Sequence, residues 1–385
     1  MKKKLISILG STGSIGQQTL EVVSHFKEDF EIVGLSCNQN LTILKKQIQK
    51  FLPKNVHIAN KSLIPELKKF INSNKYKTKI LDPDTGLEEI AKYDQDILIV
   101  AIFGTISLKP TEIAIKKGTS IGLANKEILV AAGIQIMELA KKFKVKIRPI
   151  DSEHAALEQC IENQKLEDIN SVTLTASGGP FWQLKSDQFS NIELNDTLKH
   201  PTWKMGKKIT IDSATMMNKG FEVIEAHHLF NIPFEKIDVL IHPQSYVHAI
   251  ANFKNGTNLA QFSETDMKIP IQKALFSPKV KKAPLPPFQF KDYTKLEFYP
   301  VDHIKFPLLK IAYQAGKNGG SYPIVLNTCN DFANHLFQIG KIKYPDIHKI
   351  IKNYLDSHQK TNPKTIDDII ELENETTKHL KHIYG

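Results

Sequence analysis

The chain has 385 residues, of which 41% are hydrophobic and 24% are charged, and this composition is that of a folded globular protein. A chain of this length usually folds around more than one hydrophobic core, so two or three domains are expected. The formal net charge of +10 comes mostly from lysines scattered along the chain without interleaved aromatic side chains. This pattern argues against nucleic-acid binding and fits a partner that is a small acidic molecule, such as a phosphate ester, at least as well as a plain solvated surface.

Three cysteines, Cys37, Cys160 and Cys329, show no C-x-x-C spacing, so neither a disulfide framework nor a thiolate zinc site is expected. The apolar stretch Leu5–Leu9 is too short for a signal peptide and leads directly into a glycine turn, so it is interpreted as a buried strand. The longest apolar run, Ile97–Phe103, is far shorter than a membrane span. The protein is therefore expected in the cytoplasm, with no membrane and no nucleic acid as a partner.

Residues 1–150 alternate short apolar runs with stretches of helical periodicity. Strands are expected at Leu5–Leu9, Glu31–Leu35, Val56–Ala59, Ile97–Ala101, Ser120–Leu123 and Lys144–Ile150. Helices are expected at Thr19–His25, Leu41–Phe51 and Lys126–Lys142. Alternating strands and helices are typical of a doubly wound parallel sheet, so this part is predicted to be a Rossmann-like, dinucleotide-binding domain.

The pattern changes after residue 150. An α+β mixture follows over residues 151–276, with strands expected at Ser171–Ser177, Lys208–Ile211, Val239–Ile241 and Leu259–Ser263. Residues 277–302 are rich in proline and lysine and are interpreted as an extended linker. Helical spacing returns over residues 303–385, at Phe306–Gln314, Val325–Gln338, Asp346–His358 and Ile366–Tyr384. The predicted fold class is therefore α/β, with an N-terminal Rossmann-like parallel sheet, a central α+β catalytic domain and a small C-terminal helical domain.

The first expected strand leads through the turn Gly10-Ser11-Thr12-Gly13-Ser14-Ile15-Gly16 into a helix. Glycines let the backbone approach a pyrophosphate closely, and the helix N-terminus presents free N–H groups to that charge. The spacing is G-x-x-G-x-x-G rather than G-x-G-x-x-G, so the inference depends on the strand before and the helix after the turn. A plain strand-to-helix turn is the alternative.

The second expected strand is followed by Ser36-Cys37-Asn38-Gln39-Asn40, which contains no acidic residue. An Asp or Glu at this place binds the adenosine ribose and repels a 2′-phosphate, so its absence favours NADP over NAD.

Asp151 and Glu153 are two residues apart and directly follow an expected strand. On an extended segment they face the same way, with Ser152 turned to the other side. Glu222 offers a third oxygen ligand, and three carboxylates leave open positions on Mg²⁺ or Mn²⁺ for substrate oxygens. A solvated surface pair is the alternative. A histidine site at His242 and His248 also has suitable spacing, although hydrogen-bonded structural roles are commoner for such residues.

Several segments carry groups that bind phosphate. Ser177 is followed by Gly178 and Gly179, and a hydroxyl beside free glycine N–H groups forms an anion nest. Ser213, Asn218 and Lys219 add a hydroxyl, an amide and an ammonium group, although each motif is also typical of a turn or a helix cap. The loop from His200 to Gly206 contains Trp203, which fits either a lid that expels water or a core residue. Asn125, Lys126 and Glu127 follow the expected strand Ser120–Leu123. They fit either a position in the ligand crevice at the end of the sheet or a plain helix start.

Eight motifs together resemble one enzyme family, the NADPH-dependent 1-deoxy-D-xylulose 5-phosphate reductoisomerases of non-mevalonate isoprenoid biosynthesis. The motifs are GSTGSIG, LANKE, DSEH, SGGPF, HPTWKMG, KITIDSATMMNKG, IHPQS and DMKIPI, in family order and essentially from end to end. Such a set is highly specific.

The resemblance implies a role for each matching residue. It implies that Asp151, Glu153 and Glu222 hold the divalent metal ion, Mg²⁺ or Mn²⁺, and belong to the catalytic group with Lys126. The residues implied to contact the sugar phosphate are Lys126, Ser152, Glu153, Ser177, His200, Ser213, Asn218, Lys219 and Glu222. Those implied to line the NADPH site are Thr12, Gly13, Ser14, Ile15, Asn38, Gln39, Asn40, Asn125, Glu127 and Gly206. Trp203 and Met205 are implied to belong to the lid, and a homodimer is implied.

The reaction that the resemblance implies is rearrangement and reduction of 1-deoxy-D-xylulose 5-phosphate to 2-C-methyl-D-erythritol 4-phosphate. A metal ion suits it, because adjacent carbonyl and hydroxyl oxygens chelate the ion, which stabilises developing negative charge. Lys126 and metal-bound groups are both candidates for proton transfer. One departure is that many relatives carry glycine and a basic residue where this chain has Asn38 and Gln39, which predicts a weaker preference for NADPH over NADH.

Two other functions are weighed against this one. A metal-dependent hydrolase that uses Asp151, Glu222 and the two histidines would turn over without a nicotinamide. A catalytically silent NADP-binding sensor would keep the cofactor turn only. Retention of all three carboxylates and of both anion-binding segments argues against the sensor.

Overall fold

The computed structural model describes residues 2–203, 205–292 and 295–385. They form two compact units, each described here by itself. Unit 1 contains residues 1–125, 136–155 and 266–286, and unit 2 contains residues 126–135, 156–265 and 287–385. Of the five points at which the chain passes from one unit to the other, two fall within helices, at 135/136 in α6 (Glu127–Phe143) and at 155/156 in α7 (Ser152–Ile161).

Unit 1 is built around a parallel sheet of seven described strands in the order β4-β3-β2-β1-β5-β6-β7. The strands are β1 (Lys4–Leu9), β2 (Phe30–Cys37), β3 (Asn55–Ile58), β4 (Lys79–Ile80), β5 (Ile97–Val100), β6 (Ser120–Leu123) and β7 (Ile147–Pro149). The helices are α1 (Ser14–His25), α2 (Leu41–Phe51), α3 (Ile64–Ser73), α4 (Gly86–Lys92), α5 (Leu108–Lys116) and α11 (Lys268–Phe276), with short turns η1 (Lys61–Leu63) and η2 (Thr105–Ser107).

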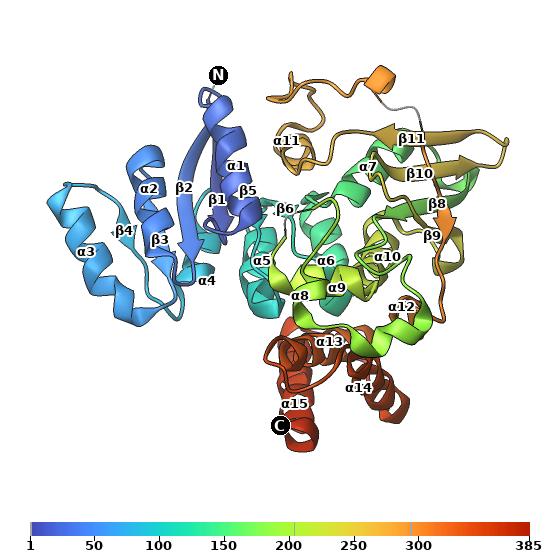
Figure 1. The fold of residues 1–385 in the computed structure, drawn as a ribbon. Coiled ribbons are helices and arrows are strands. Elements are labelled where there is room, and N and C mark those ends of the chain that lie inside the picture. The colour runs from blue at the N-terminus through green and yellow to red at the C-terminus, as the bar shows by residue number, and fades with distance from the viewer. Residues whose placement is uncertain (1, 204, 293–294) are drawn as a thin grey trace. The chain divides into compact units, whose positions relative to one another are not determined.

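The order of the strands reverses beside β1, because the chain runs outward from β1 to β4 and then returns to β5. Helices α1, α2, α3 and α11 share one apolar cluster with the sheet, as the buried side chains Leu20, Leu44, Leu67 and Leu275 illustrate. Figure 1 shows β1, β2 and β3 with their helices in blue. A ligand crevice is expected at the carboxyl ends of the strands at such a reversal, which is where the turn after β1 lies.

Unit 2 contains a mixed sheet in the order β11-β10-β8-β9-β12, where β8 and β9 are parallel and the other pairs are antiparallel. The strands are β8 (Ile169–Ala176), β9 (Ile237–Ile241), β10 (Val247–Phe253), β11 (Asn258–Phe262) and β12 (Tyr299–Pro300). The helices are α8 (Leu194–Thr197), α9 (Lys207–Ala214), α10 (Met217–Phe230), α12 (Pro307–Asn318), α13 (Tyr322–Gln338), α14 (Tyr344–Ser357) and α15 (Ile366–Tyr384). Short turns are η3 (Leu166–Asp168), η4 (Ser186–Asn191), η5 (Phe234–Lys236) and η6 (Phe290–Asp292).

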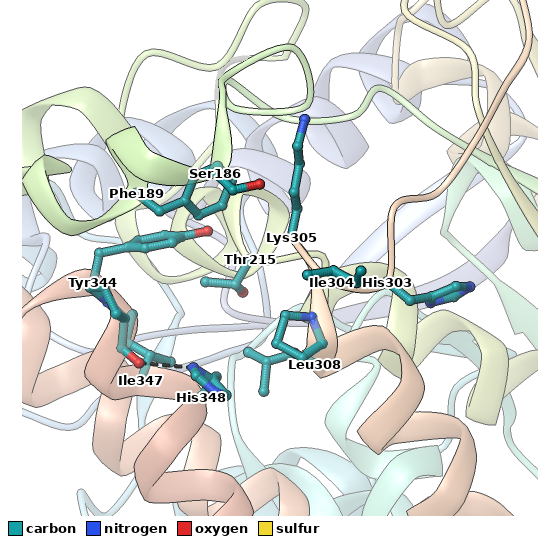
Figure 2. A pocket seen from close by; sticks show the side chains of 12 residues that line it. Ser186, Phe189, Thr215, His303, Ile304, Lys305, Leu308, Tyr344, Ile347 and His348 are labelled. Atoms are coloured by element: carbon teal, nitrogen blue, oxygen red, sulfur yellow. Dashed lines mark hydrogen bonds between the residues drawn. The ribbon is translucent and has the colours of Figure 1, made fainter.

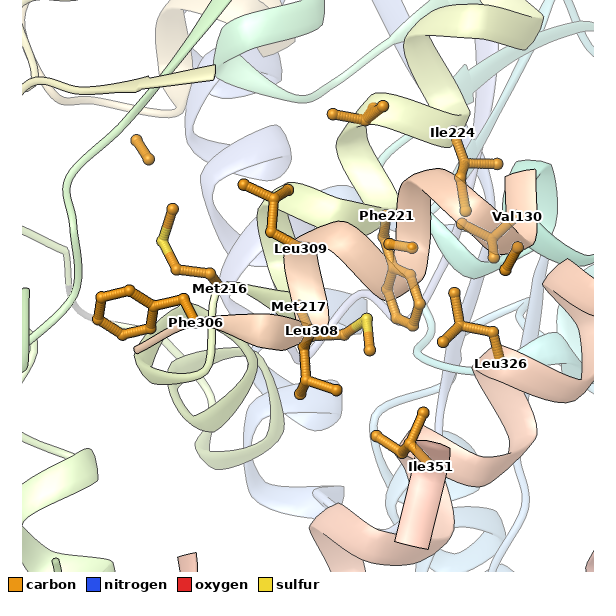
Figure 3. Packing of buried hydrophobic residues seen from close by; sticks show 14 of the residues in the cluster. Val130, Met216, Met217, Phe221, Ile224, Phe306, Leu308, Leu309, Leu326 and Ile351 are labelled. Atoms are coloured by element: carbon orange, nitrogen blue, oxygen red, sulfur yellow. The ribbon is translucent and has the colours of Figure 1, made fainter. Parts of the chain in front are cut away.

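One hydrophobic cluster holds unit 2 together. Figure 3 shows Phe221 of α10 packed among side chains from α12 and α13, with Leu309 and Leu326 nearby. Phe221 and Leu309 are fully buried, and such side chains contribute roughly 1.5–3 kcal/mol each. Helix α10 carries predicted site residues on the same turns as these core side chains, so the core determines where they lie.

The α/β fold class and the predicted helices Leu41–Phe51 and Ile366–Tyr384 are confirmed. The strand expected at Lys208–Ile211 is wrong, because Lys207–Ala214 is helix α9. The β-branched run Ile209-Thr210-Ile211 favours a strand by propensity alone. The helix forms because it buries Ile211 and Ala214 and pairs Lys208 with Asp212 one turn apart. Strands β4, β10 and β12 were not predicted.

The expected domain boundaries at residues 150, 276 and 302 stay predictions. Within the described residues, no helix is both long and apolar enough to cross a membrane.

Candidate active site

The turn after β1 has the geometry of a phosphate-binding turn in unit 1. Gly10 has φ +86°, and a side chain there would meet the carbonyl oxygen of Ala101 at 2.4 Å. Ser11 is buried and its hydroxyl donates to Gln47 Oε1 at 2.7 Å. This bond ties the turn to helix α2. Gly13 and Ser14 are exposed at the start of α1. The helix N-terminus therefore presents backbone N–H groups to solvent, where an anion is favoured.

The segment after β2 lies beside this turn in the sheet, since β1 and β2 are paired. Asn38, Gln39 and Asn40 are all exposed. The Asn40 side chain accepts from the amide of Ile43 at 3.1 Å and caps α2. Asn38 and Gln39 are thus available to a ligand, whereas the Asn40 side chain also supports the helix.

Asn125 follows β6 and is buried. Its side-chain amide donates to the carbonyl oxygens of Ile102 and Gly104, the latter at 2.7 Å. These two bonds fix the loop that follows β5, so Asn125 orders the carboxyl edge of the sheet.

Asp151 and Glu153 lie at the start of α7, not on an extended segment, so the predicted geometry of this pair is wrong. Asp151 Oδ1 accepts from the amides of Glu153 at 3.1 Å and His154 at 3.2 Å, which turns the chain into a helix directly after Asp151. His154 Nδ1 lies 2.9 Å from the same oxygen, and the Ser152 hydroxyl donates to the Glu153 carboxylate. The two carboxylates are nonetheless held by hydrogen bonds on one short segment at the start of α7.

Glu222 lies in unit 2 on α10 and is 1% exposed. Asn218 Nδ2 donates to its Oε1 at 2.6 Å, and Lys219 Nζ pairs with its Oε2. Lys126 Nζ lies 3.6 Å from Oε1. The two ammonium groups and the amide donor offset part of the cost of burying this carboxylate. Four predicted residues are thus brought together: Lys126, Asn218, Lys219 and Glu222.

Ser177, His200 and Ser213 form a second group in unit 2. His200 Nε2 lies 3.0 Å from Ser177 Oγ and 3.1 Å from Ser213 Oγ. Gly179 has φ +66°, and a side chain there would meet Ser213 O at 2.9 Å, so the glycine turn packs directly on the end of α9. Burial lowers the pKa of His200 to about 4, so its ring is neutral at pH 7. The group offers two hydroxyls and a ring N–H, which suit a phosphate.

The loop between α8 and α9 contains the predicted lid residues. Trp203 and Met205 are half-buried, and the Trp203 ring contacts the His248 ring at 6.5 Å between centroids. Gly206 is exposed and is the N-cap of α9. Lys204 lies outside the described residues. Trp203 is therefore on a loop without regular structure and is not a member of the large apolar cluster of unit 2.

Three comparisons with known proteins bear on this arrangement. Family models described as 1-deoxy-D-xylulose 5-phosphate reductoisomerase match residues 6–133, and those of its C-terminal domains match residues 147–230 and 262–379. The chain belongs to this family. The predicted resemblance is confirmed.

Relatives match over nearly the whole length. The 1-deoxy-D-xylulose 5-phosphate reductoisomerase of Clostridium acetobutylicum is 45% identical over 99% of this chain and 100% of its own. That of Thermoanaerobacter pseudethanolicus is 44% identical over 99% of each chain.

Solved structures of 1-deoxy-D-xylulose 5-phosphate reductoisomerases have the same fold as this chain over nearly its whole length. The Zymomonas mobilis reductoisomerase in complex with NADPH has a TM-score of 0.92 at 34% identity and covers 100% of this chain and 99% of its own. A reductoisomerase in complex with NADPH, fosmidomycin and magnesium has a TM-score of 0.93 at 35% identity and covers 98% of each chain.

The histidine alternative finds no support in the geometry of His242. Its Nδ1 lies 2.8 Å from the carbonyl oxygen of Glu297, and its ring stacks on Phe298 with centroids 4.7 Å apart. These are the contacts of a structural histidine. His248 lies on β10 against Trp203.

A cavity of about 350 Å³ in unit 2 lies between η4 and the starts of α12 and α14 (Figure 2). It is lined by residues that include Phe189, Thr215, Lys305 and Tyr344. None of the predicted site residues lines it, although Thr215 is two residues from Ser213.

Sequence reasoning missed the ion network around Lys208. Lys208 Nζ lies 2.6 Å from Glu127 Oε1, so the carboxylate of this predicted cofactor residue faces α9. The lysine also pairs with Asp212 and Asp331. The Lys208–Asp212 spacing of four residues is the signal that points to a helix at this place.

Proposed function

We propose that this chain converts 1-deoxy-D-xylulose 5-phosphate to 2-C-methyl-D-erythritol 4-phosphate, using NADPH and a divalent metal ion. The observation that carries the proposal is end-to-end membership in the reductoisomerase family. That membership confirms the predicted class, an NADP-dependent and metal-dependent oxidoreductase. Solved relatives contain NADPH and magnesium.

The metal ligands that we propose are Asp151, Glu153 and Glu222. Carboxylate oxygens are hard ligands that suit Mg²⁺ or Mn²⁺, and no cysteine competes for the site. Asp151 and Glu222 are both nearly inaccessible to solvent, at 5% and 1% exposure, and carboxylates buried to this degree are normally held by cations or hydrogen-bond donors. A bound dication polarises the substrate carbonyl and stabilises the charge that develops on its oxygen.

The substrate residues that we propose fall into two groups in unit 2. We assign the phosphate to Ser177, His200 and Ser213, and we add Asn218 and Lys219, which contact Glu222, to the substrate residues. Lys126 and Lys219 flank Glu222 and lie where a sugar hydroxyl or carbonyl would meet the carboxylate. Either ammonium group can donate a proton or a hydrogen bond to an oxygen of the substrate. On unit 1, Ser152 and Glu153 complete the proposed set.

The NADPH residues that we propose follow the turn after β1 and the end of β2. The amides of Thr12, Gly13, Ser14 and Ile15 suit the pyrophosphate, because they lie at the N-terminus of α1. Asn38, Gln39 and Asn40 suit the adenosine ribose and its 2′-phosphate. Asn125, Glu127 and Gly206 complete the set towards the nicotinamide. Because Glu127 is paired with Lys208, its contribution is to position Lys126 next to it.

Trp203 and Met205 are proposed as the lid. The loop that carries them begins at His200, whose ring belongs to the phosphate group. Phosphate binding and loop position are thereby linked through one residue, so remote binding energy can be used to exclude water from the reaction.

We propose a homodimer. Strand β11 is an edge strand of the mixed sheet, and Leu259 on it is 47% exposed. Phe288 and Phe290 gather on Phe262 at the same edge, with Phe290 largely exposed. An exposed edge strand beside exposed aromatic rings is a surface suited to a second copy of the chain. Sedimentation at micromolar concentration tests this.

We further propose that the domains of function are 1–150 for NADPH, 151–276 for metal and substrate, a linker over 277–302 and a helical domain over 303–385. A cytoplasmic location is proposed because Cys37, Cys160 and Cys329 are all buried free thiols.

The function is tested by NADPH absorbance. Chelator-treated protein is mixed with 1-deoxy-D-xylulose 5-phosphate, with and without Mg²⁺ or Mn²⁺. Oxidation that requires both substrate and metal supports the proposal. Binding of NADPH without oxidation under saturating metal and substrate would contradict it and favour the sensor.

A further inference from the structure

Lys208, on the first turn of α9, is the centre of a buried ion network in unit 2. Its Nζ lies 2.6 Å from Glu127 Oε1, 3.1 Å from Asp212 Oδ2 and 3.0 Å from Asp331 Oδ1. The same ammonium group lies over the ring of Phe221, 5.3 Å from its centroid. One side chain therefore joins α6, α9, α10 and α13.

Asp212 is held from its other side by α13. Asn330 Nδ2 and Asn334 Nδ2 each donate to Asp212 Oδ1 at 2.9 Å. Asn334 Nδ2 also lies 3.1 Å from the backbone oxygen of Lys208. Helix α9 is thus connected to α13 through the side chains of Lys208 and Asp212 and through its own backbone.

The network carries more negative than positive charge. Burial would raise the pKa of Glu127, but Lys208 outweighs this and lowers it. The pKa of Lys208 is raised well above its usual value, because three carboxylates outweigh the cost of burial. Burial raises the pKa of Asp331 to about 6, with Lys208 opposing the shift. Removing Lys208 would leave three carboxylates facing one another in a partly buried site.

Two of the helices that Lys208 joins, α9 and α6, have proposed site residues at or next to their ends. Helix α9 starts after Gly206, where the lid loop ends, and contains Ser213 of the phosphate group. Helix α6 starts at Glu127, next to Lys126, whose Nζ lies 3.6 Å from Glu222. We propose that Lys208 is a positioning residue, which holds the lid hinge, Ser213 and Lys126 in one fixed arrangement against α13.

A buried ion network is a costly way to hold helices together, because apolar side chains of similar volume often do so as well or better. The advantage of an ion network is that its contacts are directional. Three carboxylates at defined distances allow one position of the ammonium group, whereas apolar side chains allow two helices to shift along each other. This inference rests on the proposed function, since the substrate is the ligand whose binding reports it.

The test compares Lys208→Met with Lys207→Met, an exposed neighbour on the same helix turn. Both are made in a Trp182→Phe background, so that Trp203 is the only tryptophan and reports the lid. For Lys208→Met we expect the KM for 1-deoxy-D-xylulose 5-phosphate to rise at least tenfold and the Trp203 response to this ligand to weaken. The KM for NADPH should change less than threefold. Lys207→Met should match the parent in all three.

A second variant keeps the test decisive if Lys208→Met fails to fold. Asp331 is at the partly exposed end of the network, and Asp331→Asn preserves its shape. It should raise the substrate KM about threefold and weaken the Trp203 response. An unchanged substrate KM and an unchanged Trp203 response in the folded variants would overturn the positioning role. Absence of turnover in the parent would instead contradict the proposed function, and the Trp203 response would still decide the positioning role.

Discussion

The backbone amide of Trp203 donates to Nδ1 of His200 at 2.9 Å, and the amide of Thr202 lies 3.3 Å from the same nitrogen. A nitrogen that accepts from amides carries no proton, so the neutral ring has its proton on Nε2. Nε2 is the atom that faces Ser177 and Ser213. The loop thus sets the tautomer that directs an N–H donor at Ser177 and Ser213, the proposed phosphate site.

This relationship predicts how stability depends on pH. The pKa of His200 is about 4 in the folded state, below the usual value of 6.5, because the ring is buried. The unfolded chain therefore binds more protons between pH 6.5 and 4, so stability is complete above 6.5 and falls as the pH is lowered through this window. His200→Asn should reduce that fall, as measured by urea unfolding between pH 4 and 8.

Two features refine this experiment. His228 is also buried with a pKa near 4, so part of the pH dependence should persist in the His200 variant. Exposed His303→Asn is the matched control and should leave the curve unchanged. Identical curves for the parent and His200→Asn would show that His200 does not contribute.

Glu153→Gln should lower kcat at least a hundredfold and leave NADPH binding unchanged. The amide keeps the shape of the side chain but removes the charge of a proposed metal ligand. NADPH oxidation and NADPH fluorescence titration measure the two quantities. Glu162→Gln, on an exposed site after α7, is the control. Comparable activity in Glu153→Gln would remove it from the metal ligands.

Lys219→Ala should raise the KM for the sugar phosphate at least tenfold, with little change in the KM for NADPH. Lys219 is 3% exposed and pairs with Glu222, so its charge acts within the site and is poorly screened. Exposed Lys254→Ala tests whether general loss of positive charge has the same effect. An unaltered substrate KM would contradict the placement of Lys219 on the substrate.

Gln39→Arg should increase the preference for NADPH over NADH about fivefold, because a guanidinium group on a phosphate contributes about 1 kcal/mol at an exposed position. Gln39 is exposed after β2, so the change should not affect stability. The ratio of kcat/KM for the two cofactors measures the effect. An unchanged ratio would place the 2′-phosphate elsewhere.

Local patterns were enough for much of the fold. Helix α2 was predicted with its observed bounds because its apolar residues recur at helical spacing, and the structure adds that Asn40 caps it. The turn at Gly10 was recognised because its spaced glycines stand between an expected strand and an expected helix, and the structure gives Gly10 a φ of +86° against the backbone of Ala101. The family was recognised from eight motifs in family order. Carboxylates, hydroxyls and lysines in these motifs are identified by residue type alone, so they can be read from the sequence without knowledge of their geometry.

Tertiary packing determined the rest. Residues 209–211 are β-branched and favour a strand by propensity, yet burial of Ile211 and the pairing of Lys208 with Asp212 make this segment helical. Asp151 starts a helix because its carboxylate accepts two backbone amides, which spacing along the chain does not reveal. Lys208 meets Asp331 across 123 positions of sequence. The periodicity of a sequence shows only which face of a helix or strand is apolar. The partner of a buried charged side chain depends on which helices and strands the fold places next to it.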